Sequence, residues 1–228
     1  MKYIFLPGMD GTGELYKPFT KQLSGIDFEV INLNHFSEST YSFLTTALVE
    51  KLNNENMVLI AESFSGPLAL NIASRLGSKV KAVCICASFV SSPVGKIFSF
   101  APWKMLFSFR PPKFLVKHYL IGDCDSKSLN SFYLAIQAAS ASNLAARLRA
   151  VFSLRPDQLP ELSIPVLYLE GTEDRLIGPQ SVKKFKKKYP HSVIKKIQGP
   201  HLLMQTQPDK CLKEIEDFCK NKIAQIKV

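Results

Sequence analysis

The chain has 228 residues, 46% of them hydrophobic, so it is long enough to bury one substantial core, and no stretch approaches the 18 apolar residues of a transmembrane helix. The apolar run at residues 3–6 is too short for a secretory signal, and five cysteines without a C-x-x-C spacing predict reduced thiols in a cytoplasmic protein with no metal, disulfide framework or cofactor. The net charge of +10 alone does not predict a specific nucleic-acid partner, because the sequence has no recognition helix, zinc spacing or RNP pattern.

Short apolar runs alternate with stretches of helical periodicity along most of the chain. Strands that alternate with helices predict βαβ units and a parallel sheet, and strands that are apolar throughout predict that both faces are covered. We therefore expect an α/β protein with a mostly parallel six-stranded sheet and helices on both faces. The predicted strands are residues 2–6, 28–33, 57–61, 80–87, 165–170 and 193–197, and the predicted helices are 14–23, 40–52, 64–76, 180–189 and 209–226.

This alternation stops between residues 88 and 162, where helical patterns replace the strands. They lie at residues 97–107, 112–121, 126–139 and 142–154. The sequence therefore predicts a core made of residues 1–87 and 163–228 and a helical lid inserted at residues 88–162.

The early part of the predicted lid is rich in aromatic residues, with five in the thirteen residues 97–109. Ordinary packing onto the core explains most of them. In a functional interpretation they form an apolar pocket for an acyl chain, with Trp103 and Phe107 as candidate walls. An interfacial segment that docks on lipid is less favoured, because the pattern shows no strong single-faced moment.

The most informative residue is Ser63, which lies between a buried strand and a helix in residues 57–70. A serine at such a sharp turn has the geometry of a nucleophile elbow, and the small residues Ala61 and Ser65 fit where strand and helix crowd together. Ser65 is the rival nucleophile, but Pro67 would then occupy the crowded position two residues later. The alternative without catalysis is a serine that caps the helix.

A serine nucleophile needs a base and an acid that orients the base. His201 follows the last predicted strand, after Gly199-Pro200, and Asp174 lies four residues past the strand 165–170. Both would lie at the carboxyl edge of the sheet, where open α/β sheets bind ligands. A solvated loop histidine and a turn aspartate are the alternatives, and Glu173 is a weaker candidate for the acid.

The oxyanion of such a reaction needs backbone N–H donors. Phe64, directly after Ser63 at the start of a helix, supplies one, and Met9 in the glycine-containing loop after the first strand is our candidate for the other. The glycines of that loop, Gly8, Gly11 and Gly13, do not have the spacing of a phosphate-binding motif.

The order serine, aspartate, histidine after successive strands resembles the α/β-hydrolase superfamily over almost the whole chain. Residues 7–11, 61–66, 171–174 and 199–201 match its oxyanion loop, elbow, acid loop and base loop, although Pro7 replaces a frequent histidine and the elbow lacks the usual glycines. The resemblance implies a compact member that lacks the two antiparallel first strands. It is also similar to esterase- and thioesterase-like proteins, which include acyl-ester synthases, and in size and basic lid to pimeloyl-[acyl-carrier-protein] methyl ester esterases.

The residues thus predict a serine hydrolase that cleaves carboxylic esters or thioesters through an acyl-enzyme. An acyltransferase and a non-catalytic binding protein of the same fold are the alternatives. Residues 93–155 hold nine basic and two acidic side chains, which predicts a basic rim for an acidic acyl-carrier protein, although a solvated cationic surface also accounts for them. The lid cations are Lys113, Lys117, Arg147, Arg149 and Arg155, with Arg147 and Arg149 as candidate substrate-binding residues.

Overall fold

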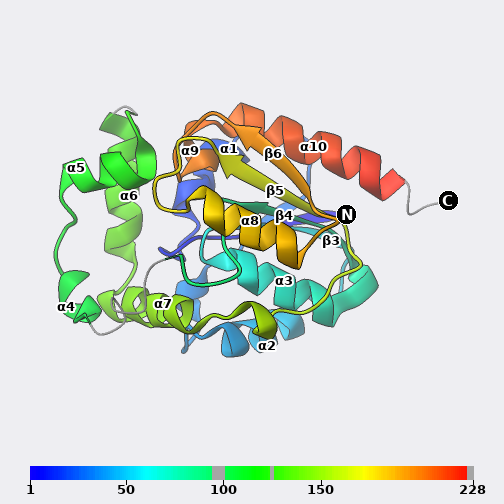
Figure 1. The fold of residues 1–228 in the computed structure, drawn as a ribbon, viewed down its shortest axis with the longest axis horizontal. Helices are drawn as coiled ribbons and strands as arrows, with labels where there is room; N and C mark the ends of the chain where they lie inside the picture. The colour runs from blue at the N-terminus through cyan, green and yellow to red at the C-terminus, as the bar shows by residue number, and fades with distance from the viewer. Residues whose placement is uncertain (94–100, 124–125, 225–228) are drawn as a thin grey trace.

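The computed structural model describes residues 1–93, 101–123 and 126–224, and its strands form one sheet (Figure 1). The strand order is β2-β1-β3-β4-β5-β6, and every neighbouring pair is parallel. The predicted six-stranded parallel sheet is therefore confirmed. The strands are β1 (Lys2–Leu6), β2 (Phe28–Val30), β3 (Met57–Glu62), β4 (Val80–Cys86), β5 (Val166–Gly171) and β6 (Val193–Ile197).

Helices cover both faces of the sheet. One face carries α2 (Tyr41–Leu52), α3 (Ser65–Leu76) and α8 (Pro179–Lys188), and the other carries α1 (Lys17–Thr20), α9 (Leu203–Thr206) and α10 (Pro208–Ala224). Along β3, Leu59 packs into the first layer and Val58 into the second, since neighbouring side chains of a strand point to opposite faces. This explains why the β3 sequence is apolar throughout.

The predicted strand at residues 28–33 ends earlier, at Val30. The Asn32 side chain accepts a hydrogen bond from the Asn34 amide and caps a 3-10 turn at Leu33–His35. The amide of Leu33 donates to the carbonyl of Gly11 at 2.7 Å. These bonds turn the chain away from the sheet and toward the loop that follows β1, so the strand cannot continue.

Helices also fill the region between β4 and β5, beyond the carboxyl ends of the strands (Figure 1). Here we call residues 88–162 the insertion. Residues 97–100 of the predicted helix at 97–107 lie outside the described residues, and the helix described there, α4, is limited to Trp103–Leu106. The division into core and insertion stays a prediction. The elements are α4 (Trp103–Leu106), α5 (Lys113–Val116), a π-helical turn (Lys117–Ile121), α6 (Ser126–Ala138) and α7 (Ala141–Ser153).

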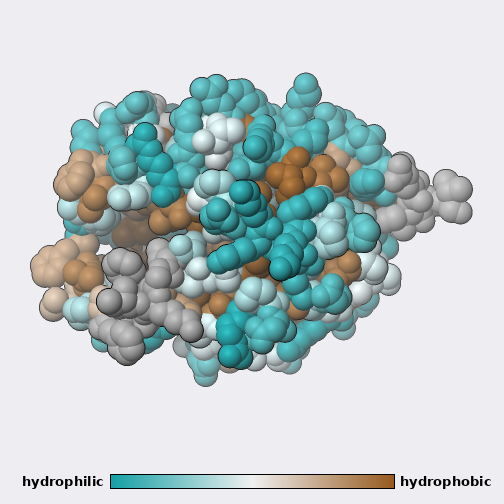
Figure 2. Space-filling view, viewed as in Figure 1, coloured by the Kyte–Doolittle hydropathy of each residue, from teal (hydrophilic) through white to brown (hydrophobic). Residues whose placement is uncertain are grey.

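The insertion is packed against the core by several of its apolar side chains. Side chains of α6, including Phe132, form a small apolar cluster with Leu15 and Leu202 of the core. The end of α7 joins the main core through Val151. On the outside, Figure 2 shows hydrophobic residues at the surface over α4 and α5, whereas the surface over α8 is mostly hydrophilic.

The helices of the described residues include none that combines the length and the apolar character needed to span a bilayer.

Candidate active site

Ser63 occupies a strained turn between β3 and α3. Its backbone has a φ of 49°, in the left-handed region that non-glycine residues rarely adopt. Three hydrogen bonds hold this conformation: the Ser63 amide donates to the Cys86 carbonyl at 2.9 Å, and the Ser63 carbonyl accepts from the Ser88 hydroxyl at 2.5 Å and the Gly66 amide at 3.2 Å. The turn therefore has the geometry that the sequence predicts for an elbow.

The turn is crowded by its neighbours, which explains its small residues. A Cβ atom on Gly66 would lie 2.0 Å from the Ser88 Oγ, so a larger residue does not fit there. The hydroxyl of Ser65, the rival nucleophile, is fully buried and donates to the Pro7 carbonyl. Ser65 therefore joins α3 to the loop after β1.

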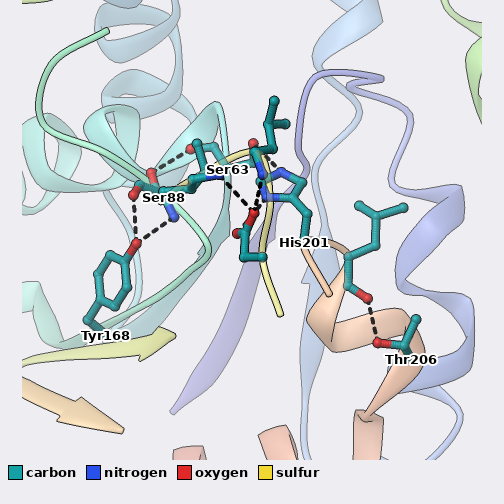
Figure 3. A network of polar contacts seen from close by, with 9 residues as sticks. Ser63, Ser88, Tyr168, His201 and Thr206 are labelled. Atoms are coloured by element: carbon teal, nitrogen blue, oxygen red, sulfur yellow. Dashed lines mark hydrogen bonds and ion pairs between the residues drawn. The ribbon is translucent and has the colours of Figure 1, made fainter. Parts of the chain in front are cut away.

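Three predicted residues form a hydrogen-bonded chain (Figure 3). The distance from Ser63 Oγ to His201 Nε2 is 3.0 Å, and that from His201 Nδ1 to Asp174 Oδ2 is 2.8 Å. Because a carboxylate only accepts hydrogen bonds, this pairing assigns the proton to Nδ1 and leaves Nε2 free to accept the Ser63 proton. The side chains of His201 and Asp174 are each 3% exposed, so little water competes for these bonds.

The carboxylate of Asp174 is oriented by its own loop. Its Oδ1 accepts hydrogen bonds from the amides of Leu176 and Ile177, both at 2.8 Å, and its Oδ2 is left to face the imidazole. Glu173, the weaker candidate for the acid, is exposed and accepts a bond from Gln198 instead.

The loops that carry Asp174 and His201 are packed together at Gly171. A Cβ atom there would lie 2.8 Å from the carbonyl oxygens of both Gly199 and Pro200. The amide of Glu173 donates to the Gly199 carbonyl at 2.9 Å. The glycine thus lets the two backbones approach closely, and this contact fixes the acid relative to the base.

The two candidate oxyanion donors belong to backbone segments that adjoin Ser63. The loop at residues 7–13 passes beside the serine: a Cβ atom on Gly8 would lie 3.8 Å from Ser63 Cβ. The peptide of Phe64 is held by Tyr41, whose hydroxyl donates to the Phe64 carbonyl at 2.9 Å and whose ring stacks on the Phe64 ring at 4.9 Å. The sequence analysis missed Tyr41, because a tyrosine in the first turn of a helix carries no distinctive signal.

Arg147 of α7 holds the loop at residues 7–13 in place. Its Nη1 donates to the carbonyls of Met9 at 3.0 Å and Asp10 at 2.9 Å, and its Nη2 donates to Asn34 Oδ1 at 2.7 Å. The residue is fully buried, and this burial lowers the pKa of the guanidinium to about 10. The expectation that Arg147 belongs to a solvent-facing basic rim is therefore wrong, because its charge is taken up by backbone carbonyls inside the protein.

Gly11 makes room for this arginine. Its φ is 69°, and a Cβ atom there would lie 2.2 Å from Arg147 Nη1. Gly11→Ala should lower the free energy of unfolding by about 2–4 kcal/mol, because it adds backbone strain and displaces a buried charge. Gly25→Ala is the matched control, since Gly25 has a φ of 73° but nothing within 4 Å of a Cβ, and it should cost about 1 kcal/mol. Urea unfolding measures both, and equal losses would contradict the packing argument.

Glu62, directly before Ser63, is buried and only partly paired. Its Oε2 accepts a bond from Gln205 Nε2 at 2.9 Å, while Glu62 Oε1 and Gln205 Oε1 find no hydrogen-bond partner among the residues that the structure describes. Burial raises the pKa of Glu62 to about 7, and the Gln205 bond opposes this shift. A protonated Glu62 also gains an O–H group, which is the kind of hydrogen-bond donor that Gln205 Oε1 lacks.

This burial makes the stability of the protein depend on pH. Below the ordinary value of 4.5, Glu62 is protonated in both the folded and the unfolded chain; between 4.5 and about 7 the unfolded chain loses the proton first. The contribution of Glu62 to the free energy of unfolding should therefore fall over this range, by on the order of 3 kcal/mol. Glu62→Gln should remove the loss, so the Tm difference from wild type should be larger at pH 8 than at pH 4.5. A pH-independent difference would contradict this assignment.

The remaining predicted substrate residues lie in the insertion. The ring of Trp103 packs on Phe107 at 5.9 Å and on Phe152 at 6.1 Å, and Arg149 is exposed beside a groove of about 590 Å³ between α7 and Tyr41. Their role toward a substrate stays a prediction. Among the described residues, no cluster of three or more histidine, cysteine or acidic side chains is placed to hold a metal.

The insertion also contacts the loops of the acid and the base. The amide of Leu202, next to His201, donates to the Leu120 carbonyl at 2.8 Å. Arg175, next to Asp174, donates from Nη1 to His118 Nδ1 at 2.9 Å. Both partners belong to the π-helical turn, so this short segment is hydrogen-bonded to the loops of both His201 and Asp174.

Comparison with known proteins identifies the fold. No family model and no curated protein matches the sequence. The structure is similar to that of a lipase-esterase related protein from Clostridium acetobutylicum, with a TM-score of 0.78 at 19% identity over 95% of this chain and 93% of that one. It is similar to MenH from S. aureus, with a TM-score of 0.79 at 17% identity over 97% and 94% of the two chains. An esterase from Thermogutta terrifontis matches with a TM-score of 0.76 at 19% identity over 97% and 90%.

The chain thus has the α/β-hydrolase fold, as its sequence predicts. The resemblance is confirmed at this level. The narrower similarity to pimeloyl-[acyl-carrier-protein] methyl ester esterases stays a prediction.

Proposed function

We propose that this protein is a serine hydrolase that cleaves carboxylic esters or thioesters through an acyl-enzyme. The observation that carries the proposal is the buried hydrogen-bonded chain from Asp174 through His201 to Ser63, with Ser63 on a strained turn. Structural neighbours support it, since several of them are named esterases.

The geometry suits the two steps of acyl transfer to water. His201 Nε2 takes the proton of Ser63 Oγ as the oxygen attacks the acyl carbon, and Asp174 stabilises the imidazolium that forms. Backbone N–H groups of Met9 and Phe64 donate to the oxyanion of the tetrahedral intermediate. His201 then protonates the leaving alcohol or thiol, and a water molecule activated by the same nitrogen releases the acid and restores Ser63.

A fluorophosphonate probe tests the nucleophile directly. We expect one covalent adduct, located by peptide mass spectrometry at Ser63, because the probe reacts with a serine that an imidazole deprotonates. Ser65→Ala should still be labelled and is the matched control, since Ser65 lies two residues away with its hydroxyl bonded to Pro7. A protein that stays unlabelled would instead favour a non-catalytic binding protein of this fold.

The substrate side of the proposal is an acyl group, delivered as a small ester or thioester or on an acidic acyl-carrier protein. A panel of acyl esters and acyl thioesters of graded length, assayed against Ser63→Ala, would define the chain length and the leaving group. Added alcohols would distinguish hydrolysis from acyl transfer, because an acyltransferase would give more new ester than free acid. Charge reversal at Arg149 should weaken binding of a carrier protein if the exposed cations form its docking rim.

A further inference from the structure

The insertion carries an unusual concentration of exposed apolar side chains. The described residues include nine large hydrophobic side chains classed as exposed, and seven of these lie in the insertion. Phe109, Phe114 and Leu134 are 68%, 69% and 66% exposed. Scattered exposed apolar residues are normal, but a cluster of this kind marks a binding surface. The other four are Met105, Leu106, Leu115 and Tyr119.

The same segment is strongly basic. Residues 101–122 contain four lysines or arginines and no aspartate or glutamate. Each of these cations lies within two sequence positions of an exposed apolar residue. Lys104 precedes Met105, Arg110 follows Phe109, and Lys113 precedes Phe114. Figure 2 shows brown residues beside teal ones at this end of the molecule.

We propose that α4, the residues 107–112, α5 and the π-helical turn form a docking surface for an anionic lipid bilayer. At such an interface apolar side chains enter the boundary between headgroups and acyl chains while neighbouring lysines and arginines stay at the anionic headgroups. A binding surface for a protein instead separates an apolar centre from a charged rim. The interleaving of cations and apolar side chains along residues 104–117 therefore favours lipid.

A second copy of the chain is the less suitable occupant, because two such faces would bring basic surfaces together without a carboxylate to pair them. The sequence pattern disfavoured a lipid-docking segment because it shows no helical moment. In the structure the apolar side chains are divided between two helical segments, α4 and the continuous run of α5 and the π-helical turn, with residues 107–112 between them, so no single helix carries one apolar face.

Vesicle binding tests this surface. The full chain would be sedimented with vesicles of phosphatidylcholine and phosphatidylglycerol at 7:3 and with phosphatidylcholine alone. Trp103 in α4 is the only tryptophan of the chain, so its emission should shift to the blue on docking. We expect binding to the anionic vesicles that is at least about tenfold stronger than binding to neutral ones.

Two double variants test the apolar and the ionic contribution to vesicle binding separately. Phe109→Ser/Phe114→Ser and Lys113→Glu/Lys117→Glu should each weaken binding to anionic vesicles by about tenfold or more. The double reversal Lys183→Glu/Lys187→Glu, on exposed positions of α8, changes the net charge by the same amount. It should weaken binding to anionic vesicles by less than about threefold. Circular dichroism checks that each variant folds.

Three outcomes would overturn the proposal. Equal losses for the α8 control and the α5 reversal would mean that net charge, and not this surface, attracts the vesicles. Equal binding to neutral and anionic vesicles would exclude the ionic component. If the protein does not bind vesicles, but an acidic acyl-carrier protein or a second copy of the chain binds through Phe109 and Phe114, the occupant of this surface is a protein. None of these results depends on whether Ser63 is catalytic.

Discussion

Replacing Ser63 by alanine should lower kcat for a short p-nitrophenyl ester by a factor on the order of 10⁴–10⁶, because the remaining groups cannot form the acyl-enzyme. The fold should survive, since the two backbone groups of Ser63 that brace the turn keep their partners. A thermal unfolding curve close to that of wild type would show that the loss is chemical.

The same experiment can test whether the three residues act as a unit. Ser63→Ala/His201→Ala should be no slower than Ser63→Ala alone, since the base has no function without the nucleophile. Asp174→Asn should lower kcat by a factor of about 10³–10⁴, because the side-chain amide no longer fixes the tautomer of His201. Residual activity of Ser63→Ala above 1% of wild type would refute the mechanism.

Removing the guanidinium of Arg147 should strongly destabilise the fold, because this buried group donates to two backbone carbonyls and one side chain. Arg147→Met deprives the carbonyls of Met9 and Asp10 and the side chain of Asn34 of their donors in a buried place, which should cost about 3–5 kcal/mol in the free energy of unfolding. It should also lower kcat more than it raises KM, because the peptide of Met9 is then free to move away from the oxyanion.

The matched control is Arg149→Met, two residues along the same helix and exposed, which should change the free energy of unfolding by less than about 0.5 kcal/mol. Arg147→Lys should recover part of the stability but less of kcat, because a lysine cannot bond Met9 and Asn34 at once. If Arg147→Met unfolds at the same urea concentration as Arg149→Met, the structural role given to Arg147 is wrong.

The fold and the meeting of the candidate catalytic loops could be predicted because they follow from local patterns. Apolar strands that alternate with amphipathic helices leave few arrangements other than a parallel sheet, and a parallel sheet brings Ser63, Asp174 and His201 to one edge. The small residues around Ser63 stand next to it in the sequence and mark the elbow directly, although the neighbours that crowd them, such as Ser88, come from other loops.

Arg147 and Glu62 could not be predicted, because their surroundings come from distant parts of the chain. An arginine on an amphipathic helix suggests an exposed residue, and nothing in α7 reveals that carbonyls 137 and 138 residues away will surround it. The burial of Glu62 depends equally on Gln205, 143 residues later. Prolines precede both helical segments of residues 103–121, Pro102 before α4 and Pro112 before α5, and α5 changes to a π-helical turn at Lys117, so periodicity could not describe that surface.

The contacts of the insertion with the Met9, Asp174 and His201 loops limit how this protein can be re-engineered or diversified. An exchange of residues 88–162 for the corresponding segment of another protein of this fold would remove Arg147, the Leu120 carbonyl and His118 together, and with them contacts that support the Met9, His201 and Asp174 loops. The insertion therefore cannot be exchanged without disturbing the loops of Met9, Asp174 and His201. A chimera that keeps these three residues and replaces only the outward side chains has the better chance of staying active.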